Sequence, residues 1–149
     1  MRARILIVDD DDLYVAGMTE WLEEAGYDVT GASTFEAAKQ ALFTGGPQLL
    51  ILDVRLGAFN GLQLLSTGRT AIPAIVVTGF EDCVLRADAA VFGADYMVKP
   101  IVPAALLALI EQRLAHSRPV GVEGLRELSP SPESPSQSAT SSGLPLRRQ

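Results

Sequence analysis

Cysteine and histidine are almost absent from this sequence of 149 residues. The single cysteine, Cys83, excludes an intrachain disulfide, and a reducing compartment fits this composition. The single histidine, His116, comes near the end of the last expected helix, where we interpret it as a solvated residue with no ligand role. Zinc prefers thiolate and imidazole ligands, so it fits this chain poorly.

Long apolar runs and a secretory signal are also missing. The longest apolar run, Ile101–Ile110, is too short to cross a bilayer and contains Pro103. The first residues enter a strand-like run at once, without the pattern of a signal peptide. The net charge of −6 argues against binding to nucleic acid or to an anionic membrane through the bulk surface. We therefore expect a cytoplasmic protein that contacts neither a membrane nor nucleic acid directly.

Large apolar residues become scarce after residue 116. Residues 117–149 contain eight serines, five prolines and no aromatic residue. Such a segment buries too little surface to offset the entropy that it would lose on ordering. We predict a folded domain over residues 1–116 and a disordered Ser/Pro-rich tail over residues 117–149. Whether this tail links to an output domain stays open.

Strand-like and helix-like stretches alternate through residues 1–116. Strands are expected at residues 4–8, 27–32, 48–54, 74–79 and 95–99. Helices are expected at residues 12–26, 34–46, 61–69, 81–93 and 103–116, the second one after a capping box formed by Ser33 and Glu36. The first, third and fourth strands are continuously apolar, as is typical of parallel strands covered on both faces. The pattern predicts a doubly wound α/β domain, a five-stranded parallel sheet with helices on both faces.

Chemically active residues follow the predicted strands. Asp9 and Asp10 come after the first strand, Asp53 after the third, Thr78 after the fourth and Lys99 after the fifth. Ligands of open parallel sheets bind outside the carboxyl ends of the strands, so we expect these side chains to meet there. Three carboxylates in one pocket repel one another unless a cation lies among them, and oxygen ligands suit Mg²⁺. With a hydroxyl and an ammonium beside them, the inference is a site where an aspartate accepts a phosphoryl group.

Four sequence blocks resemble the signature blocks of the response-regulator receiver domain of two-component signalling. They read ILIVDDDD, LLILDVRLGAFNGLQLL, IPAIVVTG and GADYMVKP, in that order. The resemblance extends over about residues 3–116 and implies a CheY-like fold with the flavodoxin-like strand order 2-1-3-4-5. It also implies a stand-alone response regulator, a signalling domain that promotes its own aspartyl phosphorylation and dephosphorylation rather than an enzyme.

The resemblance gives each acidic residue a role. Asp53 matches the phosphoacceptor of the family. Asp10 matches a direct Mg²⁺ ligand, and Asp9 matches its partner that acts through water. Asp53 itself and the backbone carbonyl of Arg55 complete the expected protein ligands. Asp11 and Asp12 are interpreted from the residues alone as acids at the positive end of the first helix.

The remaining site residues follow from the same resemblance. Thr78 is expected to donate its hydroxyl to the phosphoryl group, and Lys99 is expected to pair with that group. Tyr96 matches the aromatic residue that turns inward when the threonine moves, so Thr78 and Tyr96 are the expected switch. The peptide bond between Lys99 and Pro100 is expected to be cis and to direct the ammonium into the site.

Departures from the family pattern affect the loops around the acceptor. Gly57 stands where proline is usual, which suggests a looser loop, and the helix expected at residues 61–69 is about one turn short. Arg55 and Phe80 take positions that border the path of an attacking water, where small polar residues are usual. Phe80 offers this water no hydrogen bond, and Arg55 would hold the phosphoryl charge, so we expect slow hydrolysis. The alternative, that Arg55 stabilises the transition state and speeds hydrolysis, stays open.

The expected partners follow from what the chain lacks. Because no donor histidine is present, the phosphoryl group would come from a sensor histidine kinase or a histidine phosphotransfer protein. An unknown output protein would then read the phosphorylated state. An aspartyl-phosphate phosphatase would need an acid two residues after the nucleophile, and that position is Arg55. A receiver domain that serves only as a scaffold would lack an essential group. Here all five groups are present, namely Asp9, Asp10, Asp53, Thr78 and Lys99.

Overall fold

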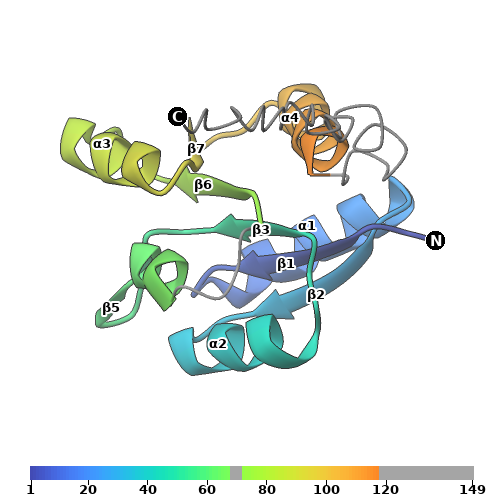
Figure 1. Ribbon diagram of the computed structural model, residues 1–149, viewed down its shortest axis with the longest axis horizontal. Helices are drawn as coiled ribbons and strands as arrows, with labels where there is room; N and C mark the ends of the chain where they lie inside the picture. The colour runs from blue at the N-terminus through green and yellow to red at the C-terminus, as the bar shows by residue number, and fades with distance from the viewer. Residues whose placement is uncertain (68–71, 118–149) are drawn as a thin grey trace, which may run out of the picture. The chain divides into compact units, whose positions relative to one another are not determined.

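A five-stranded parallel sheet forms the centre of the computed structural model, which describes residues 1–67 and 72–117 (Figure 1). Its strands are β1 (Arg4–Val8), β2 (Asp28–Ala32), β3 (Leu49–Leu52), β6 (Ala74–Thr78) and β7 (Asp95–Val98). They lie side by side in the order β2-β1-β3-β6-β7. Counted along the chain, this is the order 2-1-3-4-5, so the predicted topology is confirmed.

Helices cover both faces of this sheet. One face carries α1 (Asp12–Glu24) and α4 (Pro103–His116). The other face carries α2 (Phe35–Thr44), the 3₁₀ helix η1 (Gly61–Thr67) and α3 (Cys83–Val91). The doubly wound arrangement is therefore confirmed. Among the described residues, no helix is both long enough and apolar enough to cross a membrane.

Alternating side chains of each strand divide the core into two parts. Ile5 and Ile7 of β1 pack with Leu22 of α1 and with α4, whereas Leu6 and Val8 pack toward α2 and η1. All four strand residues are 1% exposed. A strand that is buried on both faces needs an unbroken apolar run, which is why β1, β3 and β6 show no polar alternation. The edge strand β7 is only half-buried along its length.

A short hairpin replaces the loose loop that the sequence suggested after the third strand. Strands β4 (Arg55–Leu56) and β5 (Phe59–Asn60) pair antiparallel. Gly57 between them has a φ of 59°, a conformation that favours glycine in a tight turn. The ring of Phe59 stacks on Phe35 of α2, with centroids 5.0 Å apart. The segment is therefore held by backbone pairing and by a ring contact.

The third helix and the end of the folded domain differ slightly from the ranges that the sequence predicts. The third helix is the seven-residue 3₁₀ helix η1, in line with the expected shortening, and residues 68 and 69 of the expected range lie outside the described residues. Ser117 ends α4 as its capping residue. Residues 118–149 of the expected tail also lie outside the described residues, so the disordered tail stays a prediction.

Helix α2 begins with a different cap from the one expected. The side chain of Thr34 accepts a hydrogen bond from the amide of Ala37 at 3.1 Å, so Thr34 is the N-cap and the helix starts at Phe35. The capping box of Ser33 and Glu36 is therefore wrong. A capping box needs its acid three residues after the cap, and with Thr34 as the cap that position is Ala37, which has no side-chain acceptor.

This difference gives a direct test by substitution. We expect Thr34→Ala to lower the free energy of unfolding by about 1 kcal/mol, because the amide of Ala37 loses its acceptor. Ser33→Ala, the matched control one residue earlier, should change it by less than about 0.5 kcal/mol. Urea denaturation followed by circular dichroism measures both values. A larger loss for Ser33→Ala would restore the capping box.

Candidate functional site

Two neighbouring strands deliver two aspartates to the same point. β1 and β3 pair in register through Val8 and Leu52, so Asp9 and Asp53 leave the sheet side by side. The amide of Asp53 donates to the carbonyl of Val8 at 2.8 Å, and the amide of Asp9 donates to the carbonyl of Ala32 at 3.2 Å. These backbone hydrogen bonds continue the sheet pairing by one residue. The two carboxylates are therefore positioned by the sheet itself.

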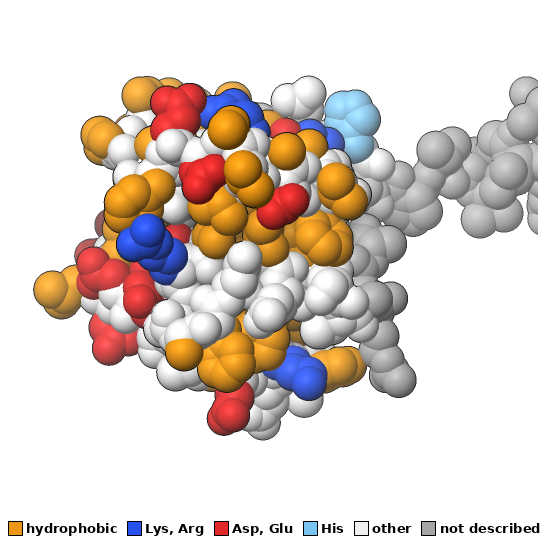
Figure 2. Space-filling model, turned by 90° about the vertical axis from the view of Figure 1, so that its left-hand side faces the viewer, with side chains coloured by type: hydrophobic (Ala, Val, Ile, Leu, Met, Phe, Trp, Pro, Cys, Tyr) orange, Lys and Arg blue, Asp and Glu red, His pale blue; other side chains and the backbone are white. Residues whose placement is uncertain are grey.

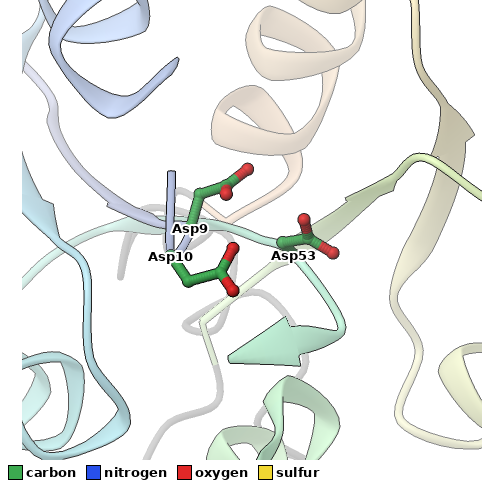
Figure 3. Close-up of side chains that lie close together, drawn as sticks. All are labelled: Asp9, Asp10 and Asp53. Carbon is green, nitrogen blue, oxygen red and sulfur yellow. The ribbon is translucent and has the colours of Figure 1, made fainter. Parts of the chain in front are cut away.

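A third carboxylate completes an acidic cluster. Asp9, Asp10 and Asp53 each place a carboxylate oxygen so that all three oxygens lie within 4.8 Å of one another (Figure 3). Asp9 is 2% exposed and Asp53 is 9% exposed, whereas Asp10 lies open to solvent. Figure 2 faces this end of the molecule and shows acidic side chains gathered beside a basic one. An oxygen-only donor set with one open side suits a hard cation such as Mg²⁺, so the residues fit the expected metal.

The other two strands bring a hydroxyl and an ammonium to the same edge. β6 and β7 pair in register through Thr78 and Val98, and the amide of Lys99 donates to the carbonyl of Thr78 at 2.8 Å. Thr78 is 1% exposed. The peptide bond between Lys99 and Pro100 is cis, as expected.

The Lys99 ammonium binds two of the three carboxylates. Its Nζ atom lies 2.7 Å from Oδ2 of Asp9 and 3.3 Å from Oδ2 of Asp53. The other oxygen of each carboxylate accepts a backbone amide, from Asp11 at 3.0 Å and from Arg55 at 3.1 Å. The structure therefore brings together Asp9, Asp10, Asp53 and Lys99 in one site, with Thr78 at the adjoining strand end.

Burial and charge shift the ionisation of this cluster in a consistent way. Burial raises the pKa of Asp53, and the hydrogen bond from the Arg55 amide and the charge of Lys99 partly oppose this shift. Burial alone would lower the pKa of Lys99, but the hydrogen bond to Asp9 and the charges of Asp53 and Asp9 raise it. Lys99 is therefore held in its charged form, which compensates carboxylates that are costly to bury.

The run of four consecutive aspartates divides between the site and the first helix. Asp9 and Asp10 belong to the acidic cluster. The side chain of Asp11 accepts hydrogen bonds from the amides of Leu13 and Tyr14 at 3.1 and 3.3 Å, so it caps α1. Asp12 occupies the first turn, near the positive end of the helix dipole. The interpretation of Asp11 and Asp12 as acids at the positive end of the first helix is therefore confirmed.

The residues expected to tune or switch the site are connected by a chain of contacts. The guanidinium of Arg55 lies 3.8 Å from the ring centroid of Phe80. The carbonyl of Phe80 accepts a hydrogen bond from the hydroxyl of Tyr96 at 2.6 Å. The guanidinium of Arg86 on α3 lies over the ring of Tyr96 and pairs with Glu81. The segment after β6 thus connects the acceptor loop to α3 and β7.

Two residues near the cluster were not singled out by the sequence analysis. A side chain on Gly61 would have its Cβ 2.1 Å from the carbonyl oxygen of Asp53, so only glycine lets η1 approach the acceptor. The ring of Tyr14 lies over the Lys99 ammonium, 4.0 Å from its Nζ atom. Side chains in a helix tilt toward its N-terminus, which is the one sequence signal that points Tyr14 toward the site.

Comparisons with known proteins agree with this geometry. The model of the response regulator receiver domain matches residues 5–111. The alkaline phosphatase synthesis transcriptional regulatory protein PhoP of Bacillus subtilis is 32% identical over 121 residues, which cover 78% of this chain and 50% of that protein. The phosphoglycerate transport system transcriptional regulatory protein PgtA of Salmonella typhimurium is 32% identical over 78% of this chain and 29% of its own length. The chain thus spans half or less of these curated relatives.

Solved structures match over nearly their full length. The CheY-like response regulator receiver domain protein of Methanospirillum hungatei superposes with a TM-score of 0.74 at 30% identity, covering 78% of this chain and 97% of that one. The BeF3-activated receiver domain of Klebsiella pneumoniae RstA gives a TM-score of 0.70 at 25% identity, covering 74% and 97%. Family model, relatives, fold and acidic edge agree, and the chain belongs to the response regulator receiver domain family.

Proposed function

We propose that Asp53 accepts a phosphoryl group from a phosphohistidine of a sensor histidine kinase or histidine phosphotransfer protein, and that this changes a protein-binding face read by an output protein. Membership of the receiver family already implies phosphorylation-dependent signalling. The observation that carries the finer proposal is one ammonium, Lys99, shared by the buried carboxylates Asp9 and Asp53, with the open carboxylate Asp10 beside them. A cytoplasmic location and action without direct nucleic-acid contact belong to the same proposal.

The chemistry assigned to Asp53 is a nucleophilic displacement. A carboxylate oxygen of Asp53 attacks phosphorus, an acyl-phosphate bond forms, and the phosphorus–nitrogen bond to the donor imidazole breaks. The imidazole leaves with the electron pair of that bond and takes up a proton. Burial that raises the pKa of Asp53 also strips water from the carboxylate and so makes it a better nucleophile.

Lys99 and Thr78 hold the incoming group. The Lys99 ammonium already faces Asp53, so it lies within reach of the negative charge that a phosphoryl group brings to that carboxylate. The hydroxyl of Thr78, at the end of the adjacent strand, is proposed to donate to a phosphoryl oxygen. Because Thr78 is buried, drawing its hydroxyl toward the site moves packed neighbours rather than solvent.

A magnesium ion is proposed at the acidic cluster, as receiver domains generally bind Mg²⁺. Asp9, Asp10 and Asp53 would hold it, together with the backbone carbonyl of Arg55. Its chemistry when bound is to neutralise negative charge on the phosphoryl group and the three carboxylates. The oxygen-only donor set and its open side support this assignment.

The protein-binding face is proposed at α3 and β7. The hydroxyl of Tyr96 on β7 donates a hydrogen bond to the carbonyl of Phe80, two residues after Thr78, and the half-buried ring packs against the core. A shift of Thr78 moves this carbonyl, so the two residues form a coupled pair with more than one arrangement. The side chains of Val84 and Val91 on α3 are exposed and offer apolar surface for a partner.

The acceptor assignment can be tested with a small phosphodonor. We expect the full chain, incubated with Mg²⁺ and a small acyl phosphate, to gain one phosphoryl group that mass spectrometry places on Asp53. Asp53→Asn should gain none, because its amide is not a nucleophile. Asp12→Asn, the matched control in the exposed first turn of α1, should gain one like the wild type. Equal yield from Asp53→Asn would disprove the assignment.

The charge balance of the cluster predicts opposite stability effects for two neighbouring aspartates. In chelator, Asp10→Asn should raise the free energy of unfolding by about 0.5 kcal/mol, because it relieves repulsion at an exposed site without breaking an ion pair. Asp9→Asn should lower it by about 1–3 kcal/mol, because Lys99 loses its shorter ion pair.

Denaturation in chelator measures both values, and calorimetric titration with Mg²⁺ then completes the test. Both variants should bind Mg²⁺ more weakly than Asp12→Asn does. A loss of stability in Asp10→Asn without metal would contradict the crowded-acid cluster.

The contact of Arg55 with Phe80 predicts slow loss of the phosphoryl group. The guanidinium of Arg55 lies over the ring of Phe80, and this contact supports the proposal that the two side chains together border the path of an attacking water. The contact is worth about 0.5–1 kcal/mol, and its loss corresponds to about a two- to fivefold faster decay. Arg55→Asn and Phe80→Glu should both show this change when decay of labelled phosphoprotein is followed in Mg²⁺.

Phe92→Glu serves as the control for the second variant. Phe92 is 45% exposed and Phe80 is 50% exposed, but Phe92 follows the end of α3, so its substitution should leave the decay rate unchanged. Slower decay in either variant would exclude a water-blocking role for the residue that was changed. Slower decay in Arg55→Asn, with Phe80→Glu still faster than the wild type, would favour the alternative that Arg55 stabilises the transition state.

A further inference from the structure

The first turn of α1 places an aromatic ring against the ammonium of the site. Tyr14 is the third residue of α1, and its ring centroid lies 4.0 Å from Nζ of Lys99. A cation within about 6 Å of a ring face is attracted by the negative face of the ring. The Lys99 side chain is 23% exposed, so this contact forms in a partly dehydrated place where such attraction is stronger than in water.

The ammonium is thus contacted by residues from three separate segments. Asp9 follows β1, Asp53 follows β3, and Tyr14 belongs to α1. The two carboxylates carry charge that they would share with any cation in the acidic cluster, which weakens their hold on the ammonium. The ring carries no net charge and takes no part in the cluster, so its attraction to Lys99 stays the same.

We propose that Tyr14 is a positioning residue that keeps the Lys99 ammonium aimed at Asp53. This inference rests on the proposed role of Lys99 in phosphoryl transfer. A lysine side chain is a flexible four-carbon stem, and a charge that wanders stabilises a transferring phosphoryl group less than a fixed one does. The ring acts on the reaction only through Lys99.

The environment of the Tyr14 hydroxyl shows which part of the side chain, the ring or the hydroxyl, can position Lys99. This oxygen is buried and has no hydrogen-bond partner among the described residues. A buried hydroxyl without a partner lowers stability and holds nothing in place. The ring face is therefore the part of Tyr14 that acts on Lys99, and phenylalanine should replace tyrosine without loss.

Two variants and a control test this inference in the full chain. Tyr14→Phe keeps the ring, Tyr14→Leu keeps an apolar side chain without a ring, and Leu13→Ala changes an exposed neighbour in the same turn. The first readout is the NMR shift of the Lys99 side-chain protons in the unphosphorylated protein, because protons over a ring face move to lower frequency. The second readout is the rate of phosphorylation by a small acyl phosphate in Mg²⁺.

We expect Tyr14→Phe and Leu13→Ala to match the wild type in both readouts, with Tyr14→Phe melting at the same or a higher temperature. Tyr14→Leu should lose the ring-induced shift of Lys99 and should be phosphorylated about five- to tenfold more slowly. An unchanged rate in Tyr14→Leu would overturn the proposal. A loss in Tyr14→Phe as large as that in Tyr14→Leu would also overturn it, since the hydroxyl would then be the active group.

Failure of the proposed function gives a different result. A wild-type protein that gains no phosphoryl group would overturn the phosphoryl-transfer role of the site. The shift of the Lys99 protons is measured without phosphorylation, so it still decides whether the ring of Tyr14 holds the ammonium. A wild-type shift equal to that of Tyr14→Leu would show that it does not.

Discussion

Charge compensation by a single ammonium is the condition on which the carboxyl edge of this sheet depends. Asp9 and Asp53 are nearly buried, and parallel pairing of β1 with β3 forces them next to each other. Without Lys99, two like charges would stand in a poorly solvated place, which is costly. The position of Lys99 depends in turn on β7, whose pairing with β6 carries the chain to this edge. The order of the strands therefore determines which charged groups meet at the site.

Much of this arrangement was predictable because it follows from backbone rules. Continuously apolar runs predicted buried parallel strands. Ligands bind at the carboxyl ends of such strands, and this rule predicted one site formed by Asp9, Asp10, Asp53, Thr78 and Lys99. The strand order came from family resemblance rather than from the pattern itself. All of these features depend on which residue follows which strand, and that information is present in a linear sequence.

The features that sequence reasoning missed depend on side-chain packing or on a choice between two neighbouring residues that are equally good candidates. The ring of Tyr14 meets Lys99 across 85 positions, and the need for glycine at position 61 arises from the carbonyl of Asp53. The cap of α2 moved by one residue because Ser33 and Thr34 are both good caps, and the local motif does not decide between them. The periodic pattern of apolar residues in the sequence contains no information about these contacts or about this cap.

The edge position of β7 has a consequence for how the molecule moves. β7 has one neighbouring strand, β6, and its side chains are half-buried, whereas β1, β3 and β6 are enclosed on both sides. Local opening of a protein begins where few apolar contacts must be broken, so β7, like the other edge strand β2, is less protected than the three central strands. Tyr96 and the approach to Lys99 lie on this strand. The charge that stabilises the acidic edge thus directly follows an edge strand, so events at the acidic edge act on a segment that fewer apolar contacts hold in place than hold the central strands.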